Sequence, residues 1–214
     1  MDRKNLALLT CGIVLVGGLI FIFHHTSSQN FSFFGKSGKK ETEGPSGPPH
    51  YEATAVVKEV LDGDTILVEI LEVLIPREGV ENKIDKVRLA KIDVEETRVS
   101  DARGKHNSVK NMSQSEYEET DYYRHALYSK NLVEALLLEE NKVYLDFDDL
   151  AGNWKPYRGK FGRLIAVVYA KPEEGWVNIN AKVLRRGFPE HTLITSFKSE
   201  FEADRWLEND YPYL

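Results

Sequence analysis

Apolar residues recur in short, partly alternating runs along much of the chain. This pattern is typical of β-strands, whose successive side chains point to opposite faces. The runs lie at about 54–61, 65–74, 86–92, 142–148 and 163–170. An Asp-Gly step joins the first two runs and is a strong short-range hairpin signal. We expect Asp62 to serve this turn and Asp64 to lie inside the strand that follows it.

A different spacing of apolar residues, at three and four positions, predicts a helix over about 122–138. Asn178 is a suitable N-cap and Gly187 a suitable stop for a second helix. A third helix is expected at 196–207. Strands with helices after the third and the fifth match an OB-type barrel. The pattern therefore predicts a mixed α+β, β-rich fold, a five-stranded OB-fold-type barrel with about three helices.

The N-terminal part of the chain has a separate pattern. Residues 6–23 form a run of 18 residues without a charge, enough for a helix to cover a hydrocarbon core of about 30 Å. We expect one N-terminal transmembrane helix within 1–25, a flexible linker at 26–50 and a folded domain at 51–214. The alternative is a cleaved secretory signal, whose apolar region is usually shorter.

Charges beside this segment predict its orientation. Arg3 and Lys4 precede it, and no lysine or arginine follows it until Lys36. The positive-inside rule places the N-terminus in the cytoplasm. We therefore expect a single-pass protein of the cell membrane with its domain outside the cytoplasm, or a secreted domain if the segment is cleaved. Cys11 is the single cysteine, so an intrachain disulfide is excluded. No feature indicates a protein partner.

A polar segment with almost no aliphatic residues covers about 97–121. Loops of this length in compact domains are usually functional or disordered. Two interpretations stay open, a flap that gates a substrate and a solvated insertion.

Acidic residues cluster at two strand ends. Asp64 begins one predicted strand, and Asp93 ends another, followed by Glu95 and Glu96. If these strands pair, Asp64 and Asp93 lie close together, and two carboxylates about 4 Å apart repel by roughly 4 kcal/mol at an effective dielectric of 20. A shared proton or a cation offsets that repulsion. Oxygen ligands without His or Cys suit calcium or magnesium. The alternative is that both acids face solvent.

Two arginines favour a cation and a phosphate at this place. Arg88 lies inside the strand that ends in Asp93, and Arg163 opens the fifth strand after a Gly turn. Arginine holds phosphate oxygens with two parallel hydrogen bonds. Acids, a hard metal ion and two arginines are typical of a phosphodiesterase.

Four motifs occur in a fixed order: DGDT at 62–65, VRLAKIDVEE at 87–96, KFGR at 160–163 and NINAKVLRRGF at 178–188. Together they resemble the staphylococcal nuclease (thermonuclease) family, over about residues 52–207. The resemblance implies a five-stranded barrel and calcium-dependent hydrolysis of DNA or RNA. The same family includes barrels that lost the acids, so a non-catalytic nucleic-acid-binding module is the alternative.

The resemblance also implies a role for individual residues. Asp64 and Asp93 would bind Ca²⁺ through carboxylates, and Val94 through its main-chain carbonyl. Glu96 would act on the attacking water as the general base. Glu95 stands where the family usually has proline.

The basic residues of the matching motifs would contact the nucleic acid. Arg88 and Arg163 would hold the scissile phosphate and stabilise the charge of the transition state. Lys160 and Phe161 are expected to bind the substrate, with Phe161 in place of the family's tyrosine.

The charge distribution is uneven. The formal net charge is −6, which argues against general affinity for polyanions. Residues 155–186, however, carry eight basic side chains against two acidic ones. This stretch predicts a localised nucleic-acid track, or alternatively a solvated basic face.

Overall fold

The computed structural model describes residues 47–81, 83–137, 141–152 and 155–214. Within these ranges no helix is both long and apolar enough to cross a membrane. The transmembrane segment predicted at 6–23 and nearly all of the linker lie outside the described residues.

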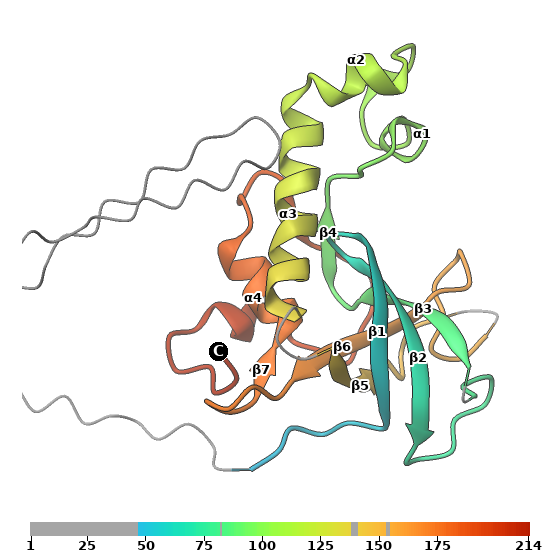
Figure 1. The fold of residues 1–214 in the computed structure, drawn as a ribbon, viewed down its shortest axis with the longest axis vertical. Coiled ribbons are helices and arrows are strands. Elements are labelled where there is room, and N and C mark those ends of the chain that lie inside the picture. Colours follow the sequence, from blue (N-terminus) through green and yellow to red (C-terminus); the bar gives the residue numbers. More distant parts are fainter. Residues whose placement is uncertain (1–46, 82, 138–140, 153–154) are drawn as a thin grey trace, which may run out of the picture. The chain divides into compact units, whose positions relative to one another are not determined.

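The described chain is a mixed α+β structure built on a closed five-stranded β-barrel, consistent with an OB-like fold (Figure 1). The barrel order is β3-β2-β1-β5-β6, and a parallel pairing of β3 with β6 closes it. The other neighbours are antiparallel. The barrel strands are β1 (Ala53–Asp62), β2 (Thr65–Val73), β3 (Ile84–Leu89), β5 (Lys142–Phe147) and β6 (Leu164–Ala170).

Alternation along the strands fills the barrel interior, because every second side chain points inward. Ile66, Val68 and Ile70 of β2 are all buried. They join one apolar core with residues of the other strands and of two helices. The barrel predicted from the periodicity of the sequence is therefore present.

The hairpin between β1 and β2 differs from the prediction by one position. Asp62 pairs with Thr65, so the two-residue turn consists of Gly63 and Asp64. Asp62 is the last residue of β1, and Asp64 is in the turn and not inside the strand. The turn itself aims Asp64 at the neighbouring strand ends.

The strand predicted at 86–92 is interrupted. β3 ends at Leu89, and a separate strand, β4 (Ile92–Val94), follows after a turn in which Lys91 has φ 63°. A left-handed residue cannot continue a strand. The turn folds the chain back, so that Arg88 of β3 faces Ile92 and Asp93 of β4.

Two helices pack on the barrel, and both were predicted. They are α3 (Asp121–Leu137) and α4 (Ile179–Arg186), and they add Val133 and Val183 to the core. The Asn178 side chain accepts a hydrogen bond from the backbone N–H of Ala181, which is the N-cap expected there. Asn178 also ends a short strand, β7 (Val177–Asn178), which pairs with β6.

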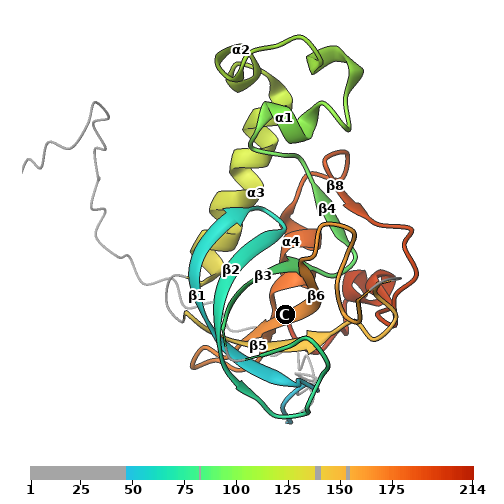
Figure 2. The same cartoon turned by 90° about the vertical axis from the view of Figure 1, so that its right-hand side faces the viewer.

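The segment predicted as one long loop contains three short helices: α1 (Val99–Ala102), η1 (Asn107–Val109) and α2 (Gln114–Glu118). They lie beyond the barrel, at the end where α3 begins (Figures 1 and 2). They bury Val99, Ala102, Val109 and Tyr117 in a small apolar cluster of their own. We call residues 97–120 the insertion. The insertion is a packed unit.

The helix predicted at 196–207 is wrong. No α-helix forms there: only the end of the segment is helical, as the 3₁₀ helix η2 (Ala203–Leu207), and the strand β8 (Thr192–Ile194), which pairs with β4, precedes the segment. Between them the Ser199 hydroxyl accepts a hydrogen bond from the backbone N–H of Phe201. Such local bonds from Ser compete with a helical backbone. Phe197 is exposed, whereas Trp206 is buried.

Gly63 offers a test of how the acidic turn is held. An added Cβ would lie 2.5 Å from the Cβ of Ser129 on α3, closer than two carbon atoms can approach. We expect Gly63→Ala to lower the free energy of unfolding by about 1–3 kcal/mol through overpacking, measured by urea denaturation. Gly47→Ala is the control, because no atom lies within 4 Å of its added Cβ. Equal midpoints for both variants would contradict the close packing of the turn on α3.

Candidate active site

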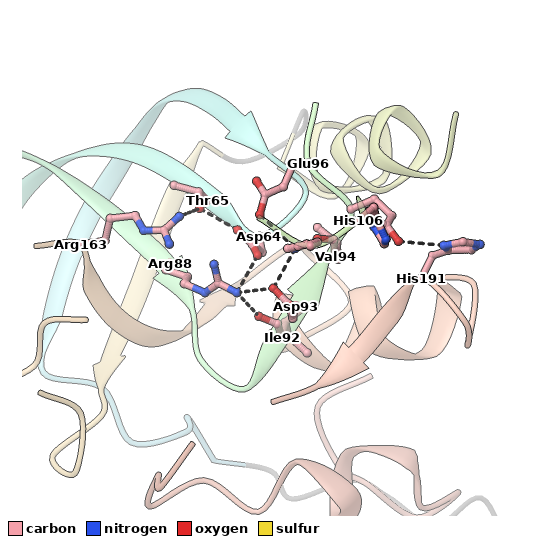
Figure 3. Close-up of polar contacts among 12 residues, drawn as sticks. Asp64, Thr65, Arg88, Ile92, Asp93, Val94, Glu96, His106, Arg163 and His191 are labelled. Carbon is pink, nitrogen blue, oxygen red and sulfur yellow. Dashed lines mark hydrogen bonds and ion pairs between the residues drawn. The ribbon is translucent and has the colours of Figure 1, made fainter. Parts of the chain in front are cut away.

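Arg88 links the two acids that the sequence predicted to be neighbours (Figure 3). Thr65, the residue after Asp64, pairs with Arg88 across β2 and β3. The Arg88 Nη2 atom lies 3.0 Å from Asp64 Oδ2 and 2.8 Å from Asp93 Oδ1. It also donates a hydrogen bond to the main-chain oxygen of Ile92 at 3.0 Å. The structure thus brings Asp64, Arg88 and Asp93 together at one end of the barrel.

Burial and charge decide the ionisation of this group. Burial disfavours the charged form of Arg88, but Asp64 and then Asp93 outweigh it and raise the pKa of the guanidinium. Burial likewise opposes ionisation of Asp93, yet Lys105 and then Arg88 hold the pKa of Asp93 below its usual value. Arg88 and Asp93 therefore both stay charged at neutral pH.

Arg163 reaches the same carboxylate through a hydroxyl. Its Nη1 atom donates to Thr65 Oγ1 at 2.9 Å, and Thr65 Oγ1 donates to Asp64 Oδ1 at 2.7 Å. Arg163 and Arg88 therefore approach Asp64 through different oxygens, as Figure 3 shows. The two predicted phosphate ligands lie at one site. Thr65 was not predicted to take part in it.

The ammonium of Lys105, in the insertion, contacts oxygens of β4 and of Glu96, which follows β4. Its Nζ atom is 3.0 Å from Asp93 Oδ1 and 3.0 Å from Glu96 Oε1, and it donates a hydrogen bond to the main-chain oxygen of Val94. Burial lowers the pKa of Lys105, but Glu96 and then Asp93 more than compensate, so the pKa is raised. Sequence reasoning missed this lysine, because nothing in the pattern of a polar segment says where its side chains fold.

Asp62 lies near Glu96, to which the family resemblance gives the role of general base. Burial, then the charge of Glu96, then that of Asp64 raise the pKa of Asp62 to about 7. The Asp62 Oδ1 atom is buried and has no hydrogen-bond partner among the described residues. Asp62 therefore belongs to the acidic site as well as to the hairpin, a role that its position before the turn did not predict.

Glu96 is fixed through its backbone by the insertion. Tyr117 of α2 is fully buried, and its hydroxyl donates to the main-chain oxygen of Glu96 at 2.7 Å. α2 itself begins at a capping box between Ser113 and Glu116. The insertion thus positions the segment that carries Glu96.

Glu95 turns away from these acids into a separate cluster. It is 6% exposed, and its two carboxylate oxygens lie 2.6 Å from His106 Nε2 and 2.9 Å from His191 Nδ1. His191 in turn stacks on His125 of α3. Glu95, in the family's proline position, therefore ties together the insertion, β4 and the segment after α4.

The donor atoms fit a hard cation. The acids Asp62, Asp64, Asp93 and Glu96 and the carbonyl of Val94 offer oxygen only. Asp64 is 2% exposed, and its Oδ2 accepts no hydrogen bond among the described residues, although Arg88 is near it. Buried carboxylate oxygens without a hydrogen-bond partner suit a hard cation such as Ca²⁺. Groups of three or more His, Cys, Asp or Glu already arranged around one metal position do not occur in the part of the chain that the structure describes.

The predicted substrate residues flank Arg163. Phe161 is 77% exposed, and both Lys160 Nζ and the Arg163 guanidinium lie 5.7 Å from the centre of its ring. An exposed ring beside two cations is a suitable surface for stacking a base.

Fewer residues are available for the predicted basic track than the number of its basic side chains suggests. Arg158 forms an ion pair with Asp85, and Arg185 donates to main-chain oxygens of Trp206 and Glu208. These two arginines serve the fold. Lys155 and Lys160 in the loop before Arg163 are exposed.

A scan against protein-family models gave no match, and a search of curated proteins gave none.

Proposed function

We propose that this chain is a metal-dependent phosphodiesterase, a calcium-dependent nuclease that hydrolyses DNA or RNA. One observation carries the proposal: Arg88 contacts both Asp64 and Asp93, and Arg163 is linked to Asp64 through the Thr65 hydroxyl. A barrel that only binds nucleic acid needs cations on its surface, and does not need a buried carboxylate between two arginines. The four motifs that resemble the staphylococcal nuclease family support the same reading.

The site residues have separate roles in the proposed reaction. Asp64, Asp93 and the Val94 carbonyl would hold Ca²⁺, which when bound polarises the phosphate. Arg88 and Arg163 donate hydrogen bonds to phosphate oxygens and stabilise the charge that builds on them.

A carboxylate accepts the proton of the attacking water. Glu96 accepts it from the water whose oxygen attacks phosphorus. The bond from phosphorus to the 5′-oxygen breaks, and this oxygen takes up a proton from solvent, to which Glu96 later returns the proton that it accepted. The products are a 3′-phosphate and a 5′-hydroxyl.

The second candidate is a non-catalytic nucleic-acid-binding module. The exposed surface of Phe161 and Lys160 favours binding in either case. Incubation of the full-length protein with single-stranded DNA, duplex DNA and RNA, in calcium or in chelator, separates the two. We expect cleavage in calcium and none in chelator. Binding without cleavage in calcium would overturn the enzyme and leave the module.

Affinity for single-stranded nucleic acid should depend on salt although the chain is acidic. With contacts from Lys155, Lys160 and Arg163, the slope of log K against log salt should be about −2, near −0.7 for each phosphate neutralised. Fluorescence anisotropy in calcium-free buffer measures it without turnover. An affinity that does not change with salt would mean that Lys155, Lys160 and Arg163 do not contact phosphates.

We further propose that residues 6–23 anchor the nuclease to the cell membrane with its domain outside the cytoplasm. The support is the uncharged run and the positive charges before it. Protease added to intact cells should digest the domain. A domain that resists protease until the cells are lysed would reverse the orientation, and a mature chain that begins after residue 25 would replace the anchor by a signal peptide.

A further inference from the structure

Besides Arg88, the structure places a second cation, Lys105, on the proposed calcium ligands. The side chain is 25% exposed, and its ammonium contacts Asp93, the Val94 carbonyl and Glu96. The first two are the oxygens that the family resemblance assigns to Ca²⁺, and the third is the proposed base. One ammonium therefore lies against three groups that the proposed reaction needs.

The insertion holds this lysine in place from both sides. Ala102 and Val109, which flank Lys105 along the chain, are both fully buried. The next residue, His106, contacts Glu95 and stacks on Tyr122 of α3. The backbone around Lys105 is thus anchored, while its long side chain is free to change rotamer without unfolding the insertion.

We infer that Lys105 competes with Ca²⁺ for the Asp93, Val94 and Glu96 oxygens, so that its side chain acts as a metal-responsive cover of the site. This inference rests on the proposed function, because it takes the same oxygens as the calcium ligands. An ammonium and a divalent cation repel each other strongly at contact distance in a partly buried site. Calcium entry must therefore move the ammonium away, and the lysine must weaken calcium binding.

The same argument separates Lys105 from Arg88. Arg88 lies on the Asp64 side, contacts Oδ2 of Asp64 and Oδ1 of Asp93, and is the proposed phosphate ligand there. Lys105 lies on the Glu96 side and contacts no oxygen of Asp64 in the described hydrogen bonds and ion pairs. Removal of Lys105 takes one cation away from Asp93, the Val94 carbonyl and Glu96 and leaves Arg88, the proposed phosphate ligand, in place.

Calcium titration of the full-length chain by isothermal calorimetry tests the competition. Lys105→Met keeps the length of the side chain and removes its charge, so calcium should bind about tenfold more tightly, since ligand charge tunes such sites over decades. Lys105→Arg keeps the charge and should bind calcium as weakly as the parent. The matched control is Lys110→Met, an exposed lysine of the same insertion, which should leave the affinity unchanged.

A second measurement needs no substitution. Acetic anhydride acylates free amines, and mass spectrometry of the parent chain reads the rate at each lysine. Saturating calcium should increase acylation of Lys105 several-fold and leave that of Lys110 unchanged.

The outcomes separate this inference from the proposed function. If the parent cleaves nucleic acid with calcium while Lys105→Met binds calcium no more tightly, or Lys105 reactivity does not respond to calcium, the cover is refuted and the nuclease stands. If neither the parent nor Lys105→Met binds calcium and the parent does not cleave, both fail. Tight calcium binding by Lys105→Met with weak binding by the parent and by Lys105→Arg would support the competition.

Discussion

Glu96→Gln should lower turnover of nucleic acid by about 10²- to 10⁴-fold, the range expected when a general base is removed. Glutamine keeps the size of the side chain and still offers an oxygen to Lys105, which lies 3.0 Å from Glu96 in the parent. The main chain of Glu96 stays held by Tyr117. Substrate affinity, measured by anisotropy in chelator, should therefore remain close to that of the parent, while kcat falls.

The neighbouring variant Glu95→Gln is unsuitable as a control for Glu96→Gln, because Glu95 is buried between His106 and His191 and loss of its charge would disturb the fold. Glu119→Gln makes the same chemical change at an exposed position of the insertion and should cleave like the parent. If Glu96→Gln also cleaves like the parent, Glu96 is not the base. Activity lost in Glu119→Gln would point instead to damage of the insertion.

The barrel was predictable because its signals are local. Alternation placed the five strands, the Asp-Gly step placed the hairpin, and Asn178 and Gly187 bounded a helix. The antiparallel pairing of β2 with β3 then brings Thr65 opposite Arg88. This register places Asp64 near Arg88, and the turn at Lys91 adds Asp93 to them.

The predicted bounds of helices and strands are wrong where tertiary contacts override the local sequence pattern. The apolar pattern at 86–92 does not indicate that Lys91 adopts a left-handed conformation, which divides the predicted strand into two. Likewise, apolar spacing at 196–207 resembles a helix, but the chain before it pairs with β4. A shift of one residue in the hairpin moved Asp64 into the turn.

The insertion shows which signals were available and which were not. The Ser113 and Glu116 capping box can be read from the sequence and marks the start of α2. The contacts of Lys105 and of the Tyr117 hydroxyl with Glu96 join residues 9 and 21 positions apart without any periodic pattern. Such contacts are set by how the insertion packs, so only the structure places them at the site.

Arg88→Lys should reduce kcat by about 10²- to 10³-fold, the cost of removing one well-placed donor from a developing oxyanion. Lysine keeps the positive charge between Asp64 and Asp93, so the acids stay compensated and the fold should survive, as circular dichroism will show. It loses the planar fork, however, and cannot donate two parallel hydrogen bonds to a phosphate while it stays on both acids.

The matched control is Arg124→Lys, which makes the same change in an exposed ion pair with Asp121 on α3 and should cleave normally. Arg88→Lys keeps the positive charge but loses the planar guanidinium. Its kcat therefore separates two explanations for the role of Arg88. Parent-like cleavage by Arg88→Lys would mean that Arg88 serves only to neutralise Asp64 and Asp93, and that the phosphate is held by Arg163. A loss of kcat with calcium affinity unchanged would instead place the Arg88 guanidinium on the reacting phosphate.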